Sequence, residues 1–276
     1  MKLGCPIMLW AMQTLDVDWL IPDWPAPPNV QAVCTTRSGG ISRGNYADLN
    51  LGLHVGDEQT DVLVNRTRLQ KASGGRVVFM NQVHGTHVAE LGTESVDGLE
   101  ADAAWTRQPG LVCAAMVADC LPVLFCHPSG LQVAAAHAGW RGLLGANGQG
   151  ILEATVAQLE AAGPLPASSR SEWMAWLGPC IGPRAFEVGD EVRAAFVAES
   201  LDAGRCFVPT VNGKWLADLP GLARQRLAAM GIERTFGNDG TEAWCTVSNP
   251  SRFFSHRRDR VSGRLAACIW LADRGA

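Results

Sequence analysis

The chain of 276 residues lacks several features that mark other classes of protein. It has no excess of positive charge, because 23 Lys and Arg face 27 Asp and Glu, whereas a nucleic-acid-binding domain is usually basic. No apolar run reaches the roughly 18 residues that a membrane-spanning helix needs. The nine cysteines are odd in number and include no Cys-x-x-Cys pair, which argues against a secreted disulfide framework. These absences favour a cytoplasmic protein that binds neither nucleic acid nor membrane.

The first residues, MKLGCPIMLWAMQ, are too short and too interrupted for a signal peptide. Met12 is an alternative start, which would make the preceding residues a disordered extension. A Pro-rich segment, IPDWPAPP, follows at 22–29. We therefore expect an N-terminal extension and Pro-rich lead-in over 1–28, and one domain over 29–276.

Apolar runs and helical spacings are mixed along the remaining chain. Strands are expected over 29–36, 76–80, 111–118, 121–126, 131–136, 173–177 and 266–271, and helices over 57–73, 142–162, 187–200 and 216–230. Hairpins and crossovers both occur in this order. The pattern therefore predicts an α/β fold of the mixed, α+β kind: a single layered domain with mixed β-sheets flanked by helices.

One hairpin predicts a metal site. The turn-forming residues 127–130, His-Pro-Ser-Gly, separate two apolar strands. If Cys126 and Leu131 close this loop, Cys120 lies opposite His137, and directly opposed residues have Cβ atoms about 4.5–5.5 Å apart. A thiolate and an imidazole at that spacing can reach one metal ion. Pro122 weakens this register, although Pro is tolerated near the start of a strand.

The same reasoning sets other candidates apart. Cys126 and His127 lie at the turn, roughly 20 Å from Cys120 at about 3.3 Å per residue. Cys113 is expected to face the other way. His84 follows a strand on a Gly-containing loop and suits a third ligand, with His87 as the alternative.

The resulting set of His84, Cys120 and His137 suits zinc. Three protein ligands leave the fourth tetrahedral position open, which is typical of a catalytic zinc rather than a structural one.

Several motifs resemble the laccase-domain family, the YfiH-like group also called peptidoglycan editing factors. They run in order over about 29–271 and are, with their positions, NQVHG (81–85), ADCLP (118–122), HAGWRG (137–142), TTRSGG (35–40), LNL (49–51), HVGD (54–57), LGPCIG (177–182) and FSHRRD (254–259). Phe186 departs from the family pattern, which usually has Tyr there. Together the motifs cover nearly the whole chain.

The resemblance implies a single α/β catalytic domain in which His84, Cys120 and His137 hold zinc. It also implies purine nucleoside phosphorylase activity on adenosine, inosine and methylthioadenosine, with adenosine deaminase activity at the same site. The partners would be a small nucleoside and phosphate. Other activities linked to the family are copper-dependent polyphenol oxidation and hydrolysis of aberrant peptidoglycan precursors.

Each nucleoside reaction needs further residues. Deamination needs a proton shuttle beside a zinc-bound water, and Asp119 qualifies if the chain has left the strand there. Phosphorolysis needs an anion site, for which Arg37 in a Gly-rich turn, Arg141 after the ligand His137, and His256 in a basic cluster are candidates. Each of these cationic residues is otherwise expected to be an ordinary surface group.

Three alternatives remain open from the residues alone. A four-copper laccase is disfavoured because the chain has only six His and no His-x-His pair, although a single His₂Cys copper site remains an alternative to zinc. Cys120 could instead be a nucleophile with His137 as its base, as in a cysteine amidase. A non-catalytic zinc protein is the third alternative.

Overall fold

Four apolar runs form strands that are buried along their whole length. They are β5 (Leu111–Val117), β6 (Leu121–Cys126), β7 (Val133–Ala138) and β13 (Leu265–Leu271). Strands covered on both faces lose the alternation of apolar and polar residues. These four strands therefore lie in the interior of two stacked sheets in the computed structural model, which describes residues 17–163 and 170–272.

Nine shorter strands complete three sheets. Their bounds are β1 (Val30–Cys34), β2 (Arg76–Phe79), β3 (Val88–Glu90), β4 (Ala103–Thr106), β8 (Met174–Leu177), β9 (Glu187–Val188), β10 (Phe207–Pro209), β11 (Trp215–Ala217) and β12 (Arg234–Gly237). One sheet has the order β1-β13-β5-β2, and a larger one has the order β12-β8-β6-β7-β4-β3. Both mix parallel and antiparallel pairs, whereas the small sheet β10-β11-β9 is antiparallel.

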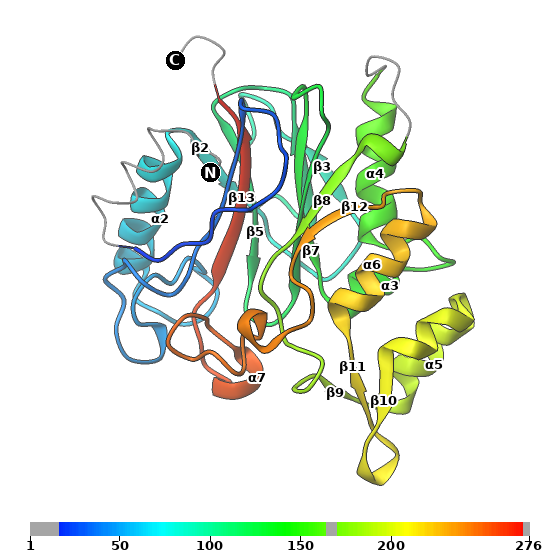
Figure 1. The fold of residues 1–276 in the computed structure, drawn as a ribbon. Helices are drawn as coiled ribbons and strands as arrows, with labels where there is room; N and C mark the ends of the chain where they lie inside the picture. Colours follow the sequence, from blue (N-terminus) through cyan, green and yellow to red (C-terminus); the bar gives the residue numbers. More distant parts are fainter. Residues whose placement is uncertain (1–16, 164–169, 273–276) are drawn as a thin grey trace.

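The helices cover the outer faces of the two sheets (Figure 1). Helix α2 (Gln59–Ser73) packs on the four-stranded sheet, and α3 (Trp140–Leu144), α4 (Ile151–Ala161), α5 (Asp190–Glu199) and α6 (Leu219–Ala229) lie on the side of the six-stranded sheet. The inner faces of the two sheets share one apolar cluster. The order is thus helix, sheet, sheet, helix, which confirms the predicted mixed α/β fold with sheets flanked by helices.

Three expected helices are shorter than the sequence suggested. The segment 142–162 is divided because Gly145, with φ of 64°, ends α3. The segments 187–200 and 216–230 each begin with a short strand, β9 and β11. The side chain of Asp218 then caps α6 by accepting a hydrogen bond from the Gly221 N–H at 2.9 Å. Gly74 ends α2 in a left-handed conformation, directly after the expected end of this helix at residue 73.

The remaining helices are short. They comprise α7 (His256–Asp259) and the 3₁₀ helices η1 (Gly44–Tyr46), η2 (Arg170–Glu172), η3 (Leu201–Cys206), η4 (Val211–Gly213) and η5 (Glu242–Trp244). Over the described ranges, no helix is long and apolar enough to cross a membrane.

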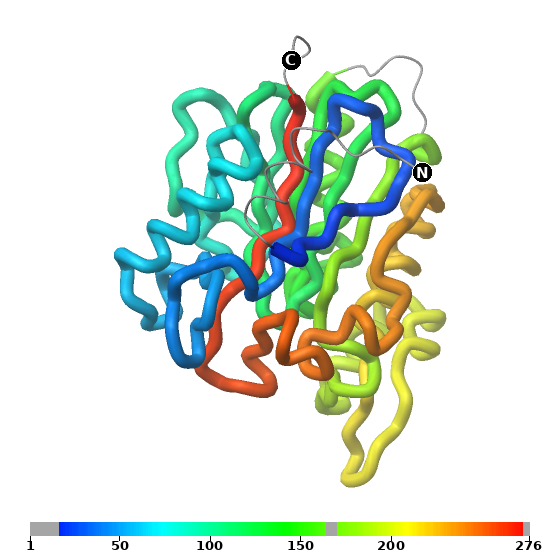
Figure 2. Tube along the Cα trace, turned by 60° about the vertical axis from the view of Figure 1, so that its left-hand side comes forward, coloured from blue at the N-terminus to red at the C-terminus, as the bar shows by residue number. Residues whose placement is uncertain are grey.

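The Pro-rich lead-in runs beside β1 and β13 (Figure 2). Leu20 and Cys34 form an isolated bridge, and Trp24 is buried in the cluster between the sheets. The division of the chain at residue 29 stays a prediction. The alternative start at Met12 lies outside the described residues.

Candidate metal centre

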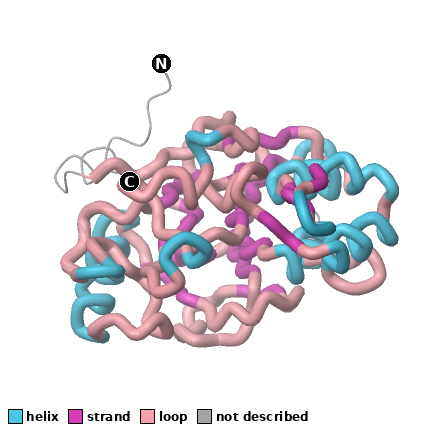
Figure 3. Tube along the Cα trace, turned by 90° about the horizontal axis from the view of Figure 1, so that it is seen from below, coloured by secondary structure: helices cyan, strands magenta, loops and turns pink. Residues whose placement is uncertain are grey.

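The candidate site lies at one edge of the two stacked sheets. Strand β2 runs parallel to β5, so their carboxyl ends meet at this edge, and β7 ends there because it runs antiparallel to β6. Seen from below, this edge is covered mainly by loops and the short helix α7 (Figure 3). Loops at strand ends are where functional side chains tend to gather.

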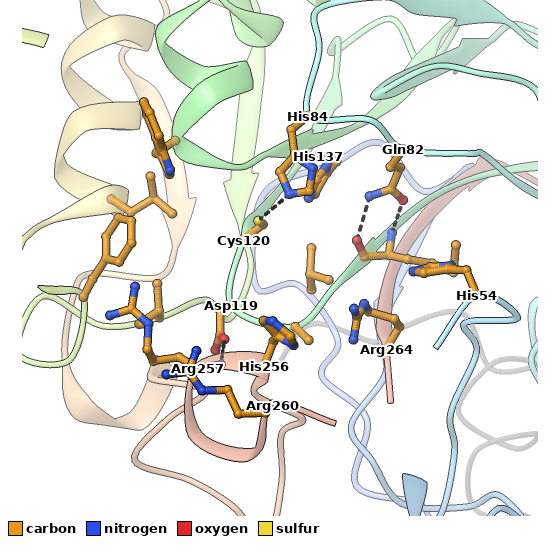
Figure 4. A pocket seen from close by; sticks show the side chains of 17 residues that line it. His54, Gln82, His84, Asp119, Cys120, His137, His256, Arg257, Arg260 and Arg264 are labelled. Carbon is orange, nitrogen blue, oxygen red and sulfur yellow. Dashed lines mark hydrogen bonds between the residues drawn. The ribbon is translucent and has the colours of Figure 1, made fainter. Parts of the chain in front are cut away.

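Three predicted metal ligands meet at this edge. His84 follows β2, Cys120 lies between β5 and β6, and His137 is in β7 (Figure 4). Their ligand atoms all lie within 4.8 Å of one another, and the Cys120 Sγ is 3.6 Å from the His84 Nε2. This ligand triad (His84, Cys120, His137) could hold a metal ion. His137 is buried, whereas His84 is exposed, so the triad opens towards solvent on one side.

The predicted hairpin register, which placed Cys120 opposite His137, was wrong by two residues. His137 lies opposite Pro122 rather than Cys120, and Cys126 pairs with Val133 rather than Leu131. The connection is longer than the four turn residues because Leu131 and Gln132 stay outside the strand, where the Gln132 side chain donates to the Leu159 carbonyl. A shift of two residues leaves every side chain on its original face. Cys120 and His137 therefore still meet.

A buried carboxylate that sequence reasoning missed holds the triad in place. Asp102 is fully buried and accepts hydrogen bonds from the backbone N–H groups of Val83, His84 and Gly85 at 3.2, 2.9 and 2.7 Å. It also lies 2.8 Å from the Nδ1 of His137. Burial pushes the pKa of Asp102 upward, but hydrogen bonds from His137 and from this backbone lower it below its usual value. The only signal in the sequence is an Asp directly before the apolar strand β4.

The ionisation of Cys120 and His137 is coupled. Burial alone would raise the pKa of the Cys120 thiol, but His137 and His84 lower it to about 6. Burial alone would lower the pKa of His137, but Cys120 and Asp102 raise it to about 9. In the metal-free pair each residue therefore favours the charged form of the other, the Cys120 thiolate and the His137 imidazolium.

Asp119 lies outside strand β5, which its predicted role in proton transfer required. Strand β5 ends at Val117, and Asp119 has a left-handed backbone with φ of 96°. One carboxylate oxygen accepts from the Thr246 hydroxyl and the other from the Arg257 N–H, both at 2.6 Å. Asp119 lines the pocket described below, and its part in proton transfer stays a prediction.

Two of the three residues predicted to bind phosphate do not line the pocket that lies beside the triad. Arg37 donates instead to the backbone carbonyls of Ala47 and Pro250 at 2.6 and 2.7 Å, because its Gly-rich turn packs against neighbouring loops. Arg141 projects over the ring of Trp140, at 4.4 Å from the ring centroid, and is exposed. Only His256 lies where the sequence argument needed it.

The residues set apart as weaker ligands also lie away from the triad. His87 is exposed and its Nδ1 contacts the Glu100 carbonyl at 2.6 Å. The Nδ1 of His127 lies 2.9 Å from the Ser129 hydroxyl. Cys113 and Cys126 are buried among apolar residues, and this burial raises the pKa of both thiols.

A pocket of about 350 Å³ lies beside the triad. Its lining includes four large apolar residues, which we call the apolar wall: Trp140, Ile181, Phe186 and Leu219. Its other sides carry polar residues, namely His54, Gln82, Asp119, His256, Arg257, Arg260 and Arg264 (Figure 4). Sequence reasoning noted Arg257 only as part of a basic cluster and missed Arg260 and Arg264, which have no motif of their own.

Fold and site together define a mixed α/β protein with a single His₂Cys group, among the described residues, that could hold a metal beside an open pocket. The family model described as multi-copper polyphenol oxidoreductase laccase matches residues 31–272. The chain therefore belongs to this laccase-domain family, as its motifs indicated.

Relatives and solved structures match nearly the whole chain. A purine nucleoside phosphorylase of Pseudomonas aeruginosa is 49% identical over 256 residues, covering 92% of this chain and 99% of that protein. The purine nucleoside phosphorylase YfiH of Escherichia coli is 48% identical over 254 residues, covering 91% and 98%. The crystal structure of Neisseria meningitidis protein NMB0706 has a TM-score of 0.85 at 44% identity, covering 93% of this chain and 100% of its own. The crystal structure of YlmD from Geobacillus stearothermophilus has a TM-score of 0.80 at 31% identity, covering 92% and 96%.

Replacing Gly139 by Ala should weaken metal binding. A Cβ at this position would lie 2.8 Å from the His84 Cδ2 and 2.9 Å from the Cys120 Sγ, so both ligands would have to move apart. We expect Gly139→Ala to fold but to lose most of its bound metal, measured by elemental analysis. Gly204→Ala is the control, because its Cβ would make only ordinary contact with Val197. Equal metal content in both variants would contradict the expectation.

Asp102→Asn should reduce the affinity for metal without altering any ligand. The amide would place N–H donors against the N–H groups that now bind the carboxylate, so His84 and His137 would lose their orientation. Loss of such a supporting carboxylate typically costs about 10- to 100-fold in metal affinity. Competition with a chelator would measure the change, with the exposed Asp202→Asn as control. An unchanged affinity would show that Asp102 does not orient the triad.

Metal affinity should rise with pH. The metal needs a thiolate and a neutral imidazole, and in the metal-free protein the pKa of His137 is raised to about 9. Binding therefore displaces one proton from His137 between about pH 7 and pH 9, and the association constant should rise about tenfold per pH unit. Below about pH 6 the Cys120 thiol must also lose its proton, so the slope should steepen. Titration in metal buffers would test this, and a flat profile between pH 7 and pH 9 would contradict it.

Proposed function

We propose that this protein is a zinc-dependent purine nucleoside phosphorylase acting on adenosine, inosine and methylthioadenosine. The observation that carries the proposal is the ligand triad at the side of a pocket whose remaining surface combines an apolar wall with several arginines. Such a pocket suits a flat base together with a polar sugar and an anion. The names of the relatives from P. aeruginosa and E. coli support the same activity.

The donor set suits zinc. Two imidazole nitrogens and one thiolate are borderline-soft ligands that leave a fourth position for water or substrate. The carboxylate of Asp102 behind His137 is the supporting partner that a ligating histidine usually has. When bound, the metal would act as a Lewis acid and lower the pKa of a bound water. Copper is the alternative metal, since His₂Cys sets also occur at copper sites.

The chain itself would orient the reactants. The apolar wall would bury the purine ring, with Trp140 and Phe186 as its aromatic members. In phosphorolysis a phosphate oxygen bonds to the ribose C1′ while the C1′–N9 bond breaks, and the departing purine takes up a proton. His256 is exposed at the pocket and is a residue that could donate this proton. Holding both reactants in one pocket supplies much of the rate enhancement.

Adenosine deamination is a second candidate activity of the same site. It is favoured by the open metal position and by Asp119, which lines the pocket near Cys120. An activated water would attack the purine C6, a carboxylate would carry a proton to the 6-amino group, and the C6–N6 bond would break to release ammonia and inosine. Asp119 would be this carboxylate, held in place by the hydrogen bonds that its oxygens accept from the Thr246 hydroxyl and the Arg257 N–H.

The competing chemistries have less support. Within the described ranges His84, Cys120 and His137 form the one His/Cys/Asp/Glu group able to hold a metal, whereas a multicopper oxidase needs several copper sites. A cysteine amidase acting on peptidoglycan precursors would use the Cys120 thiolate as nucleophile, but metal binding occupies the same sulfur. The free cysteines among the described residues suit the cytoplasmic location that we propose.

Cys120→Ala should abolish activity together with bound zinc. The zinc-loaded protein is incubated with inosine and phosphate, and hypoxanthine release is followed by a coupled absorbance assay. We expect the variant to lose at least about 100-fold in kcat, because removing a ligand leaves only two imidazoles. Cys126→Ala, which removes a buried thiol far from the pocket, should keep both zinc and activity.

The opposite results are also informative. Full activity in Cys120→Ala would overturn the mechanism. Loss of activity with zinc retained would favour a thiolate nucleophile. Oxygen uptake on phenols with bound copper would favour the oxidase.

A further inference from the structure

The lining of the pocket comes from two halves of the molecule. All four residues of the apolar wall belong to, or pack against, the apolar cluster around the six-stranded sheet. In contrast, His54 comes from the loop before α2, and Arg264 directly precedes β13 of the four-stranded sheet. Figure 4 draws both side chains on the far side of His256 from Arg257. We call His54 and Arg264 the polar side of the pocket.

The side chain of Asn50 joins the two segments that carry the polar side. Its Oδ1 accepts hydrogen bonds from the backbone N–H groups of Gly52 and Arg264, both at 2.9 Å. Its Nδ2 donates to the Asp57 carboxylate at 2.9 Å and to the Gly52 carbonyl at 3.3 Å. Asn50 is fully buried, and its amide thus uses both its donors and its acceptor. A buried amide satisfied in this way favours one arrangement, because any other would leave a polar atom unpaired.

The loop around His54 has little freedom to move relative to the start of β13. Gly52 and Asp57, which Asn50 binds, lie on either side of His54 in the sequence. A Cβ at Gly52 would lie only 2.8 Å from the Arg264 Cγ, so the loop packs closely against this side chain. The two residues of the polar side are therefore held together by one amide and one close backbone approach.

A second buried asparagine ties Asn50 to helix α2. Asn65, in α2, donates from its Nδ2 to the Asn50 carbonyl and to the Ser42 hydroxyl, both at 2.9 Å, and its Oδ1 accepts from the Ile41 N–H at 2.9 Å. Because α2 packs on the four-stranded sheet, the polar side is anchored to that sheet. Neither asparagine lines the pocket, so Asn50 can affect a ligand only through the groups that it holds.

Arg264 is oriented by its own hydrogen bonds as well. Its Nη1 donates to the carbonyls of Ser262 and Gly263 at 3.0 and 3.1 Å. Like Arg257 and Arg260, it forms no ion pair with an acidic side chain over residues 17–163 and 170–272. Its remaining N–H groups can therefore donate to a ligand in the pocket.

We propose that Asn50 is a positioning residue that holds the polar side of the pocket in place for the ribose of a nucleoside. That the ligand is a nucleoside rests on the proposed function. A purine on the apolar wall leaves its ribose to the half of the pocket that comes from the four-stranded sheet. There the imidazole of His54 and the guanidinium of Arg264 offer hydrogen bonds to the ribose hydroxyls. Groups that are fixed before binding lose little conformational freedom when the ribose arrives.

Asn50→Asp tests the proposal by changing one atom of the side chain. The new carboxylate oxygen would face the Asp57 carboxylate and the Gly52 carbonyl, so the loop that carries His54 would shift. We expect the affinity for inosine to fall about tenfold, whereas the affinity for hypoxanthine, which lacks the ribose, should stay within about twofold. Calorimetric titration of the zinc-loaded full chain measures both affinities. Asn212→Asp, at an exposed position of η4, is the control for the added charge.

A double variant, Asn50→Asp with Asp57→Asn, should recover most of the affinity for inosine. The new amide at position 57 would donate to the new carboxylate, while its oxygen would still accept from the Glu58 N–H. Recovery would separate the position of the loop from the charge added at position 50, because the double variant keeps that charge. If Asn50→Asp does not fold, Asp57→Ala gives the same test. It removes an acceptor from the half-buried end of the loop and should cause a smaller loss, again confined to inosine.

The titrations do not depend on turnover, so they separate this proposal from the proposed function. A loss confined to inosine in a protein without phosphorolysis would leave the role of Asn50 standing while the proposed function fails. Phosphorolysis together with an unchanged affinity for inosine in Asn50→Asp would overturn the role of Asn50 alone. An equal loss for inosine and hypoxanthine, or no recovery in the double variant, would also overturn it. A wild-type protein that binds neither ligand would overturn both proposals.

Discussion

One carboxylate, that of Asp102, holds the metal centre together. It joins the loop that carries His84 to the strand that carries His137, two segments that are separated by some fifty residues of sequence, and it does so without contacting the metal position. A buried carboxylate is costly unless its oxygens are hydrogen-bonded, and here three backbone N–H groups and an imidazole satisfy it. The register of β4 against β7 pairs Ala103 with Ala136, so Asp102 lies beside His137, and its carbonyl accepts the His137 N–H at 2.7 Å. The ladder of the six-stranded sheet therefore sets the orientation of the ligands.

The ligands also depend on how closely the backbone segments approach at this edge. His84 has a left-handed φ of 61° and Asp119 one of 96°, conformations that side chains rarely adopt and that cluster at functional sites. Gly139 lies against both His84 and Cys120, where no side chain fits. Some motif residues near the ligands are therefore required by the backbone rather than by the chemistry. Gly139 in the motif HAGW leaves space for His84 and Cys120, which come from two other loops.

Much of this arrangement could be predicted from the sequence, and the failures have identifiable physical causes. The buried strands and the pair Cys120 and His137 followed from apolar runs and a hairpin, and the register error was harmless because side chains alternate with a period of two. Asp102 was missed because its role comes from pairing between β4 and β7, which no local pattern reveals. Arg37 lies away from the pocket because its guanidinium donates to backbone carbonyls, which an arginine in a Gly-rich turn can bind as readily as phosphate. Arg264 has no local signal, since it reaches the pocket only because the start of β13 packs against the loop around Gly52.

The pocket has two parts, the ligand triad and the remaining lining. This difference helps to explain why members of one family are named for such different reactions. The ligand triad alone would suit zinc or copper, so its donor atoms do not decide between a single-copper oxidase and a nucleoside enzyme. The remainder of the pocket does discriminate, because a phenol offers no anion to arginines that lack acidic partners. Leaving guanidinium groups unpaired at a half-buried position raises the free energy of the empty pocket, and an anionic reactant would offset that cost on binding. The arginines beside the triad, more than the triad itself, therefore favour a reaction in which a phosphate group takes part.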